Sequence, residues 1–182
     1  MKSSLKLMVF PIDGESENEA ARRAYAQLDQ LSELKVMWVA IEKIDRNDYT
    51  YLVELNKFYE KFSYYWSLSS PKTIDCFGEK ICYEIFELCS KWKECVWGMD
   101  ALTYYAQLPE ELKIFRGGVG SIQQILVGHS WTLNQDLAFN YSKQDHGIVI
   151  SARLAKTDVL HLSPEEEEIV LHQESLTNVL CV

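Results

Sequence analysis

Three short strings in the second half of the sequence hold the residue types that could do chemistry. They are FRGG at 115–118, SWT at 130–132 and EEEEIVL at 165–171. The first places a guanidinium before two glycines, the second places two hydroxyl groups on alternate residues, and the third runs four carboxylates into an apolar stretch. Each string alone is common in proteins, so their order and spacing have to be considered together.

Arg116 follows a predicted strand at Lys113–Phe115 and precedes Gly117. An arginine side chain offers a rigid, planar set of donors that suits a phosphate or a carboxylate. A glycine beside it lets the backbone approach a ligand closely. The same string also occurs in ordinary turns, so by itself it indicates either a turn or an anion site.

Ser130 and Thr132 fall on one face of a predicted strand, because side chains alternate along a strand. A helix is predicted over Asn134–Tyr141, and either Thr132 or Asn134 could cap it. Such a cap leaves a separate role open for Ser130. Trp131, between the two hydroxyl residues, either stacks on an aromatic ligand or fills the core, and the core is the favoured interpretation.

The glutamate run has two possible registers. In a strand that starts within the run, Glu166 and Glu168 share one face, while Glu165 and Glu167 share the other. Two carboxylates on one face resist joint ionisation unless a cation lies near them, and Arg116 is a candidate for that cation. A solvated edge is the usual interpretation of such a run. If the run is functional, we expect the Glu166 and Glu168 pair, because the apolar residues follow Glu168 directly.

The elements around these strings change character near Pro109. Helical patterns dominate residues 1–108, and short strands dominate residues 109–182. Helices are predicted over 15–31, 34–44, 48–68 and from Pro71 to Val96, and a short strand over 5–10. Asp48 is the candidate N-cap of the third helix. Further strands are predicted at 113–115, 130–132, 148–154, 159–162, 169–171 and 179–182. The fold class is therefore α+β, with a helical N-terminal region packed on a C-terminal β core.

Composition excludes several classes of function. The chain has 182 residues, 47% of them hydrophobic, and a net charge of −9. A surface this acidic repels phosphate backbones, which argues against general nucleic-acid binding. The five cysteines form no CxxC pair, so we expect reduced thiols and no metal site. No stretch approaches the roughly 18 apolar residues of a membrane span, and no signal peptide is evident, so a cytoplasmic location is expected.

The three strings in this order resemble the mono-ADP-ribosyltransferase family, in its Arg-Ser-Glu branch. The resemblance covers roughly Leu108 to Val182 and looks closest to small bacterial and phage-encoded members. It implies a core of two packed sheets with an NAD-binding cleft between them. It also implies a cytoplasmic effector, in the producing or a host cell, that transfers ADP-ribose from NAD to a target protein, with arginine as the expected acceptor.

The resemblance assigns a role to each matching residue. Arg116 matches the arginine that contacts the NAD phosphates, and Gly117 gives room beside the nicotinamide. Ser130 matches the serine that helps to hold the catalytic glutamate. Glu168 matches that glutamate, which bonds the nicotinamide ribose. Glu166 matches the residue that addresses the acceptor.

Two further residues fall within the implied NAD site. Thr132 stands where many members of the family carry a second serine, and Trp131 lies between the two hydroxyl residues. His129, His161 and His172 flank the strings. We interpret the histidines as structural, because the expected reaction needs no histidine and their spacing fits no metal site.

The chemistry leaves two alternatives open besides protein modification. Water could be the acceptor, which would make the protein an NAD glycohydrolase that shares Arg116, Ser130 and Glu168 and does not need Glu166. Alternatively, the helical region could be a protein-interaction module with a degenerate, non-catalytic transferase-like tail. The first 108 residues contain no motif of the family and could select the target.

Overall fold

The computed structural model describes residues 16–143, 147–165 and 167–182 of the chain. The chain divides into two compact units, Met1–Cys82 and Tyr83–Val182. The strand predicted over 5–10 lies outside the described residues. Helix gives way to strand close to the predicted change at 108/109, since β1 begins at Glu111, whereas the division between the units lies upstream, within helix α3.

The described part of the first unit is helical. It holds α1 (Glu17–Ile41), α2 (Tyr49–Phe77) and the start of α3 (Glu79–Lys91). Ser16 caps α1 in a reciprocal arrangement with Glu19. Asp48 caps α2 as predicted, because its carboxylate accepts the N–H of Thr50 at 2.9 Å.

Aromatic side chains hold these helices together. Phe58 lies 5.2 Å from Trp38, 5.6 Å from Phe62 and 6.3 Å from Phe77 between ring centroids. Phe58 and Phe62 are fully buried. Because these rings contact one another between α1 and α2, the first unit has a core of its own within Met1–Cys82.

Helix α2 is kinked at Ser69, where the backbone leaves helical geometry (φ −167°, ψ 88°). Pro71 supplies no N–H and clashes with the preceding turn, so the ladder breaks there. The buried Thr73 hydroxyl partly compensates by donating to the carbonyls of Tyr65 and Ser69, both at 3.1 Å. A helix from Pro71 to Val96 was predicted, but Gly78, with φ 88°, ends α2 and interrupts it.

The second unit holds helices and strands together, which confirms the α+β class. Its helices are the rest of α3, α4 (Lys93–Val96), α5 (Met99–Gln107), α6 (Ile122–Leu126) and α7 (Gln135–Tyr141). Its strands are β1 (Glu111–Val119), β2 (Ser130–Thr132), β3 (Gly147–Ala155), β4 (Val159–Ser163), β5 (Glu168–Leu171) and β6 (Thr177–Cys181). The six strands predicted between residues 113 and 182 all form, whereas α5 and α6 were not predicted.

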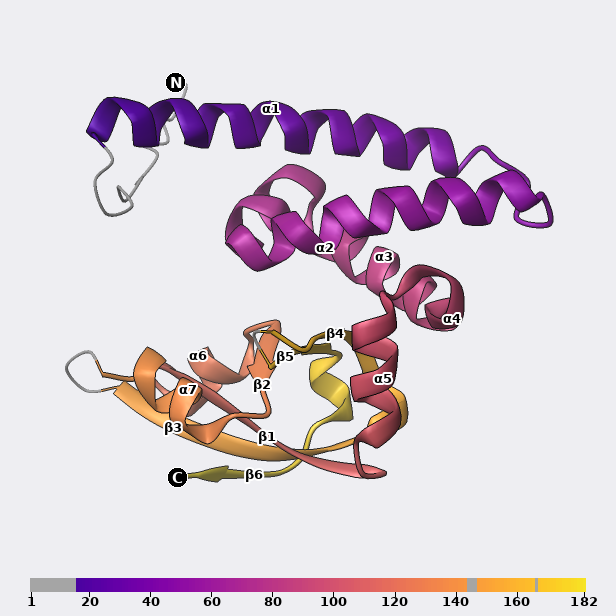
Figure 1. Ribbon diagram of the computed structural model, residues 1–182. Coiled ribbons are helices and arrows are strands. Elements are labelled where there is room, and N and C mark those ends of the chain that lie inside the picture. Colours follow the sequence, from indigo (N-terminus) through magenta and orange to yellow (C-terminus); the bar gives the residue numbers. More distant parts are fainter. Residues whose placement is uncertain (1–15, 144–146, 166) are drawn as a thin grey trace. The chain divides into compact units, whose positions relative to one another are not determined.

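The six strands form one antiparallel sheet in the order β4-β5-β2-β1-β3-β6. The resemblance implied two packed sheets, and in the described residues the strands instead share a single hydrogen-bonded sheet. Only the pair Phe115↔Thr132 joins β1 to β2. Figure 1 shows β1, β3 and β6 along the lower edge of this unit and β2, β5 and β4 above them. The sheet is therefore weakly joined where Arg116 and Ser130 lie.

Strands β1 and β3 bury the side chains of one face almost completely. β1 and β3 pair from Glu111↔Ala155 to Val119↔Gly147. The alternate residues Leu112, Ile114 and Ile150 are at most 1% exposed. Strand β3 also buries Val149, Ser151 and Ala152, so both of its faces are covered in the middle of the strand.

Helix α7 packs on the opposite face of β1 and β3. Phe115, Ala138 and Val149 form a buried cluster there. A Cβ atom at Gly117 would overlap the Ala138 carbonyl. Gly117 therefore lets a helix backbone approach the strand closely.

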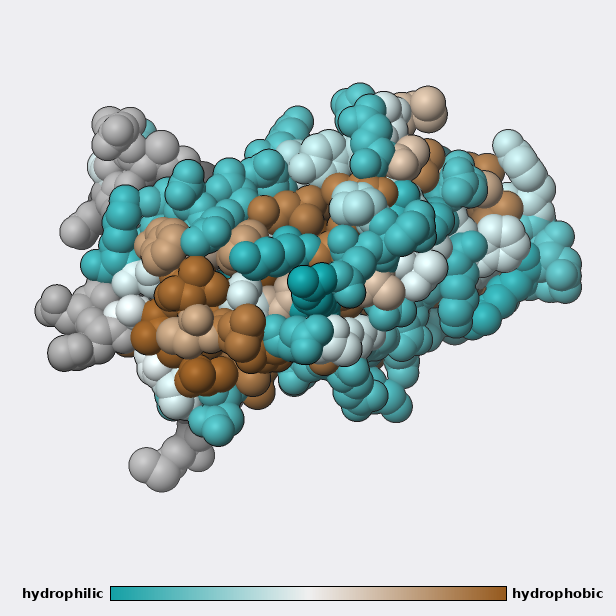
Figure 2. Space-filling view, turned by 90° about the horizontal axis from the view of Figure 1, so that it is seen from below, coloured by the Kyte–Doolittle hydropathy of each residue, from teal (hydrophilic) through white to brown (hydrophobic). Residues whose placement is uncertain are grey.

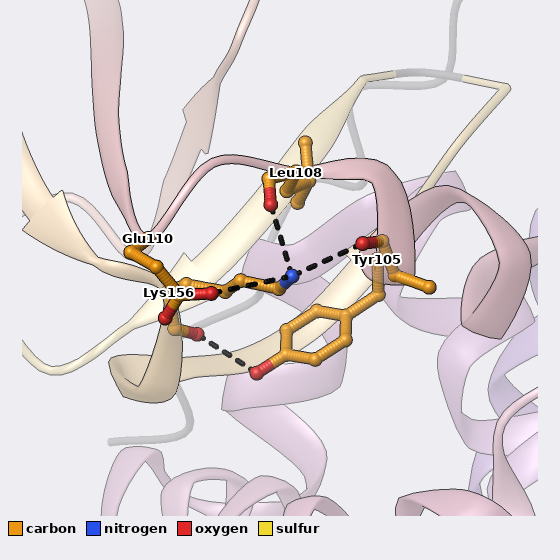
Figure 3. A network of polar contacts seen from close by, with 5 residues as sticks. Tyr105, Leu108, Glu110 and Lys156 are labelled. Carbon is orange, nitrogen blue, oxygen red and sulfur yellow. Dashed lines mark hydrogen bonds and ion pairs between the residues drawn. The ribbon is translucent and has the colours of Figure 1, made fainter.

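Lys156 ties helix α5 to the sheet (Figure 3). Its ammonium donates to the carbonyls of Leu108 at 2.9 Å and Ala106 at 3.3 Å, at the C-terminal end of α5. In return, the Tyr105 hydroxyl donates to the Lys156 carbonyl at 3.1 Å. A cation at a helix C-terminus satisfies carbonyls that have no partner within the helix.

Strand β6 forms an edge of the sheet and exposes apolar side chains. Leu180 is 64% exposed and Val182 is 47% exposed. Figure 2 shows hydrophobic side chains gathered on the face seen from below, the side on which Figure 1 draws β3 and β6. No helix within the described ranges is long and apolar enough to cross a membrane.

Candidate functional site

The side chain of Arg116 lies where β1 and β2 separate. Phe115, the residue before it, makes the single pair between these strands. Beyond that pair, the Arg116 guanidinium donates through Nη1 to the backbone carbonyl of Ser130. The structure therefore brings together two of the predicted site residues, from β1 and β2.

Gly128 makes room for this contact. A Cβ atom built at Gly128 would overlap the guanidinium of Arg116. The backbone segment Gly128–Ser130 therefore packs against the guanidinium at one end and accepts its hydrogen bond at the other. We call this segment the arginine cradle. The sequence analysis missed Gly128, because a lone glycine before a strand carries no specific signal.

Glu168 joins the same site from β5. It is the first residue of that strand and lies directly opposite Thr132 on β2. Burial lowers the pKa of Arg116, and the nearby carboxylate of Glu168 opposes that shift. An opposite charge favours the charged guanidinium only when it lies close in space. Arg116, Ser130 and Glu168, far apart in the sequence, thus converge at the junction of β1, β2 and β5.

At this junction, Nε of Arg116 and Oγ of Ser130 are buried, and neither atom has a hydrogen-bond partner among the described residues. A buried polar group without a partner costs free energy, and such groups are rare in folded proteins. A bound anion or hydroxyl group that accepts from these atoms would remove that cost, which makes the junction a candidate binding site.

Glu167 stands apart from this junction. Its carboxylate accepts a hydrogen bond of 2.6 Å from Nδ2 of Asn134, whose Oδ1 caps α7 by accepting from the backbone at Asp136 and Leu137. Its backbone is left-handed (φ 49°). Glu167 therefore has a structural role that couples the turn before β5 to α7.

The turn before β5 decides how far the strand alternation extends into the glutamate run. Strand β5 begins at Glu168, and the left-handed backbone at Glu167 interrupts the extended conformation. The strand alternation from which we placed Glu166 and Glu168 on one face therefore does not extend upstream of Glu168. Glu166 itself lies outside the described residues.

The other expected NAD-site residues have structural contacts. Trp131 is 2% exposed, which agrees with the core interpretation and leaves no open ring face for stacking. The Thr132 hydroxyl accepts the N–H of Asn134 at 3.0 Å, just before α7. The side of Gly117 that would carry a Cβ atom is filled by the backbone of Ala138.

Tyr83, His129 and His172 also lie beside the site. From the sequence we interpreted the two histidines as structural, and Tyr83 was not singled out. The Tyr83 hydroxyl of α3 is 2.6 Å from Nδ1 of His129, which immediately precedes Ser130. The ring of Tyr83 also stacks on His172 at 5.1 Å. Tyr83 is near enough to raise the pKa of Arg116. In the sequence, Tyr83 was indistinguishable from a core aromatic of a helix.

His161 belongs to the core, which agrees with our interpretation of it as a structural residue. It lies on β4 with its ring 5.4 Å from that of Phe86. It is 7% exposed, and burial lowers its pKa to about 4. The side chain is therefore neutral at physiological pH. Among the described residues, no group of three or more His, Cys, Asp or Glu side chains could hold a metal ion.

No protein-family model, curated protein or solved structure matches this chain. The function is therefore inferred from the residues themselves and from the geometry of the second unit.

Proposed function

We propose that the protein is an NAD-dependent mono-ADP-ribosyltransferase that modifies a protein, with arginine as the acceptor residue. The observation that carries the proposal is the convergence of Arg116, Ser130 and Glu168 through the Arg116–Ser130 hydrogen bond and the charge interaction of Arg116 with Glu168. These are the three residues that the resemblance selects from the sequence. The resemblance used only their identity and order, so their proximity is independent support.

Arg116 has the chemistry to hold a diphosphate. Its guanidinium keeps its charge despite burial, because arginine is the most basic of the side chains. Nη1 is committed to Ser130, while Nε has no acceptor among the described residues. Charge-assisted hydrogen bonds to a phosphate from a fixed guanidinium would restrict the dinucleotide while its glycosidic bond breaks.

Glu168 has the chemistry to stabilise the transition state. As the bond between the ribose C1′ and the nicotinamide nitrogen breaks, its electron pair leaves with nicotinamide and positive charge develops on the sugar. A fixed carboxylate stabilises that charge more in the transition state than in the ground state. The acceptor nitrogen then bonds to C1′ and loses one proton to solvent or a base.

The test of this function measures two products, free nicotinamide and labelled protein. Purified protein is incubated with NAD, and free nicotinamide is measured with and without agmatine, a small guanidino acceptor. Adenine-labelled NAD in a cell lysate then reports transfer to protein. We expect release and labelling with the native protein, and neither with Glu168→Gln. Exposed Glu165, three residues away, supplies the matched control Glu165→Gln.

The remaining outcomes separate the alternatives. Release of nicotinamide without any labelled acceptor would identify an NAD glycohydrolase and contradict the transfer step. No release with any acceptor, and no difference between the native protein and Glu168→Gln, would contradict an enzymatic function and favour an interaction module.

A further inference from the structure

One turn of helix α3 reaches both strands that carry the site. Tyr83 hydrogen-bonds to His129, which precedes β2, and stacks on His172, which follows β5. Glu87, four residues after Tyr83 on the same helix, lies 2.7 Å from Nε2 of His172. Positions four apart share a helix face. The helix thus contacts the residue before Ser130 and the residue after the strand that begins with Glu168.

His129 is the middle residue of the arginine cradle. Gly128, on one side, packs against the guanidinium of Arg116, and Ser130, on the other, accepts its hydrogen bond. A displacement of His129 would therefore move both contacts of Arg116. The hydrogen bond to Tyr83 holds the His129 side chain, and its 2.6 Å length is short for this type of bond.

We propose that Tyr83 and His129 are positioning residues for Arg116: through the arginine cradle, they hold the guanidinium in the orientation that binds the diphosphate of NAD. This inference rests on the proposed function. It assigns to helix α3, outside the segment that resembles the transferase family, a direct part in building the site.

Arg116 needs this support because the junction between β1 and β2 is weak. Because a single pair joins these strands, the sheet itself does little to fix the cradle relative to Arg116. The edge-to-face contact of Tyr83 with His129, at 5.2 Å and 72°, adds packing to the hydrogen bond. Small displacements of a binding group are enough to reduce turnover strongly, so an anchor at His129 has a large effect on the site.

The test removes one oxygen atom. Tyr83→Phe keeps the aromatic ring and removes the hydroxyl group that bonds to His129. We expect the KM for NAD to rise about tenfold, the effect of one net hydrogen bond, while kcat changes much less. Tyr141, which is 67% exposed on α7, gives the matched control Tyr141→Phe with an unchanged KM.

A second variant covers the case in which Tyr83→Phe fails to fold. His129→Asn retains a polar group near the position of Nδ1, and His129→Ala does not. We expect Asn to preserve most of the affinity for NAD and Ala to lose it. Equal KM values for Tyr83→Phe, His129→Ala and the native protein would overturn the inference.

A readout without NAD separates this inference from the proposed function. Nitrogen-15 NMR of the His129 ring and of Arg116 Nε is compared at one fixed pH in the native protein and in Tyr83→Phe. We expect both signals to shift, and Arg116 Nε–H to exchange faster with solvent in the variant. Unchanged Arg116 signals would overturn the positioning role even in an active enzyme. A native protein that does not bind NAD, but shows these shifts, would refute the function alone.

Discussion

Thr132 and Glu168 lie directly opposite each other on the antiparallel strands β2 and β5. Opposed residues of an antiparallel pair point to the same face of the sheet, so the second hydroxyl residue of the SWT string and the last glutamate of the run share one face. Ser130, two residues from Thr132, shares that face as well. The pairing thus fixes which of the described glutamates accompanies the hydroxyl residues.

Arg116→Lys should weaken NAD binding more than it slows the chemical step. Lysine keeps the charge but loses the planar donors and the contact with the Ser130 carbonyl. We expect the KM for NAD to rise by about 10- to 100-fold, the range for hydrogen bonds to a charged group. Arg153→Lys, at an exposed arginine on β3, is the control. Steady-state nicotinamide release measures both, and an unchanged KM in Arg116→Lys would contradict the phosphate-binding role.

Gly128→Ala should disturb the arginine cradle without straining the backbone, since Gly128 is not among the residues with positive φ. The added Cβ overlaps the guanidinium of Arg116. We expect destabilisation of at most about 1 kcal/mol, the low end for overpacked sites, because the guanidinium is the far end of a flexible side chain and can shift. We also expect loss of nicotinamide release, because that shift moves the guanidinium from its position. Gly98→Ala is the matched control, because nothing lies within 4 Å of a Cβ at Gly98. Thermal unfolding and NAD turnover are measured for both, and equal values would contradict the close packing.

The stability of the second unit should fall as pH decreases because of His161. Its pKa is about 4 in the folded protein and 6.5 ordinarily, so the unfolded state takes up the proton first as pH falls. The stabilisation is complete above pH 6.5 and is lost as pH falls toward about 4. At about 1.4 kcal/mol per pH unit, on the order of 3 kcal/mol is involved.

The measurement for His161 is urea unfolding at several pH values. His161→Asn should make the free energy of unfolding less dependent on pH between 4 and 6.5. Parallel curves for the native protein and His161→Asn would contradict the neutral, buried state of His161.

Lys156→Met should destabilise the packing of α5 on the sheet. The ammonium is largely buried and donates to the carbonyls of Ala106 and Leu108, which lose their partner in the variant. We expect a loss of about 0.5–1.5 kcal/mol, the net contribution of a typical hydrogen bond, because Ala106 is exposed and water can replace the lysine at its carbonyl. Lys143→Met, at an exposed lysine, should change the unfolding free energy by less than about 0.5 kcal/mol. A chemical denaturation curve resolves the difference, and equal midpoints would show that the lysine contacts contribute little.

The five cysteines should differ sharply in reactivity. Cys82 and Cys89 are buried, and burial raises the pKa of Cys82 to about 12, whereas Cys95 and Cys181 are exposed. Because the thiolate is the reactive form, iodoacetamide should modify Cys95 and Cys181 well before Cys82 and Cys89. Mass spectrometry of a time course measures the order. Early modification of Cys89 without unfolding would contradict the packing of α3.

The local elements were predictable because their signals are local. Asp48 was predicted as the cap of α2, SWT as a strand and 169–171 as the body of β5, and each is found. These features depend on capping groups and on the period of apolar residues, which neighbouring residues carry. The identity and order of Arg116, Ser130 and Glu168 were also present in the sequence.

The surroundings of these residues were not predictable. The role of Gly128 follows from the path of the Arg116 side chain, and the partnership of Tyr83 with His129 joins residues 46 positions apart. The left-handed backbone at Glu167 delays the start of β5 to Glu168, two residues later than alternation from Glu166 requires. A run of identical side chains contains no periodic signal, so its register had to come from pairing with β2.

The sequence by itself determined which residues could act and which elements carry them, since propensity, capping and hydrophobic period are properties of short segments. Only the tertiary structure decided that β1 and β2 meet at a single pair, that Arg116 turns toward Ser130 there, and that α3 supports the junction. The physical reason is that such contacts depend on packing between distant segments, whose free energies are set by complementary shape and charge rather than by any local pattern.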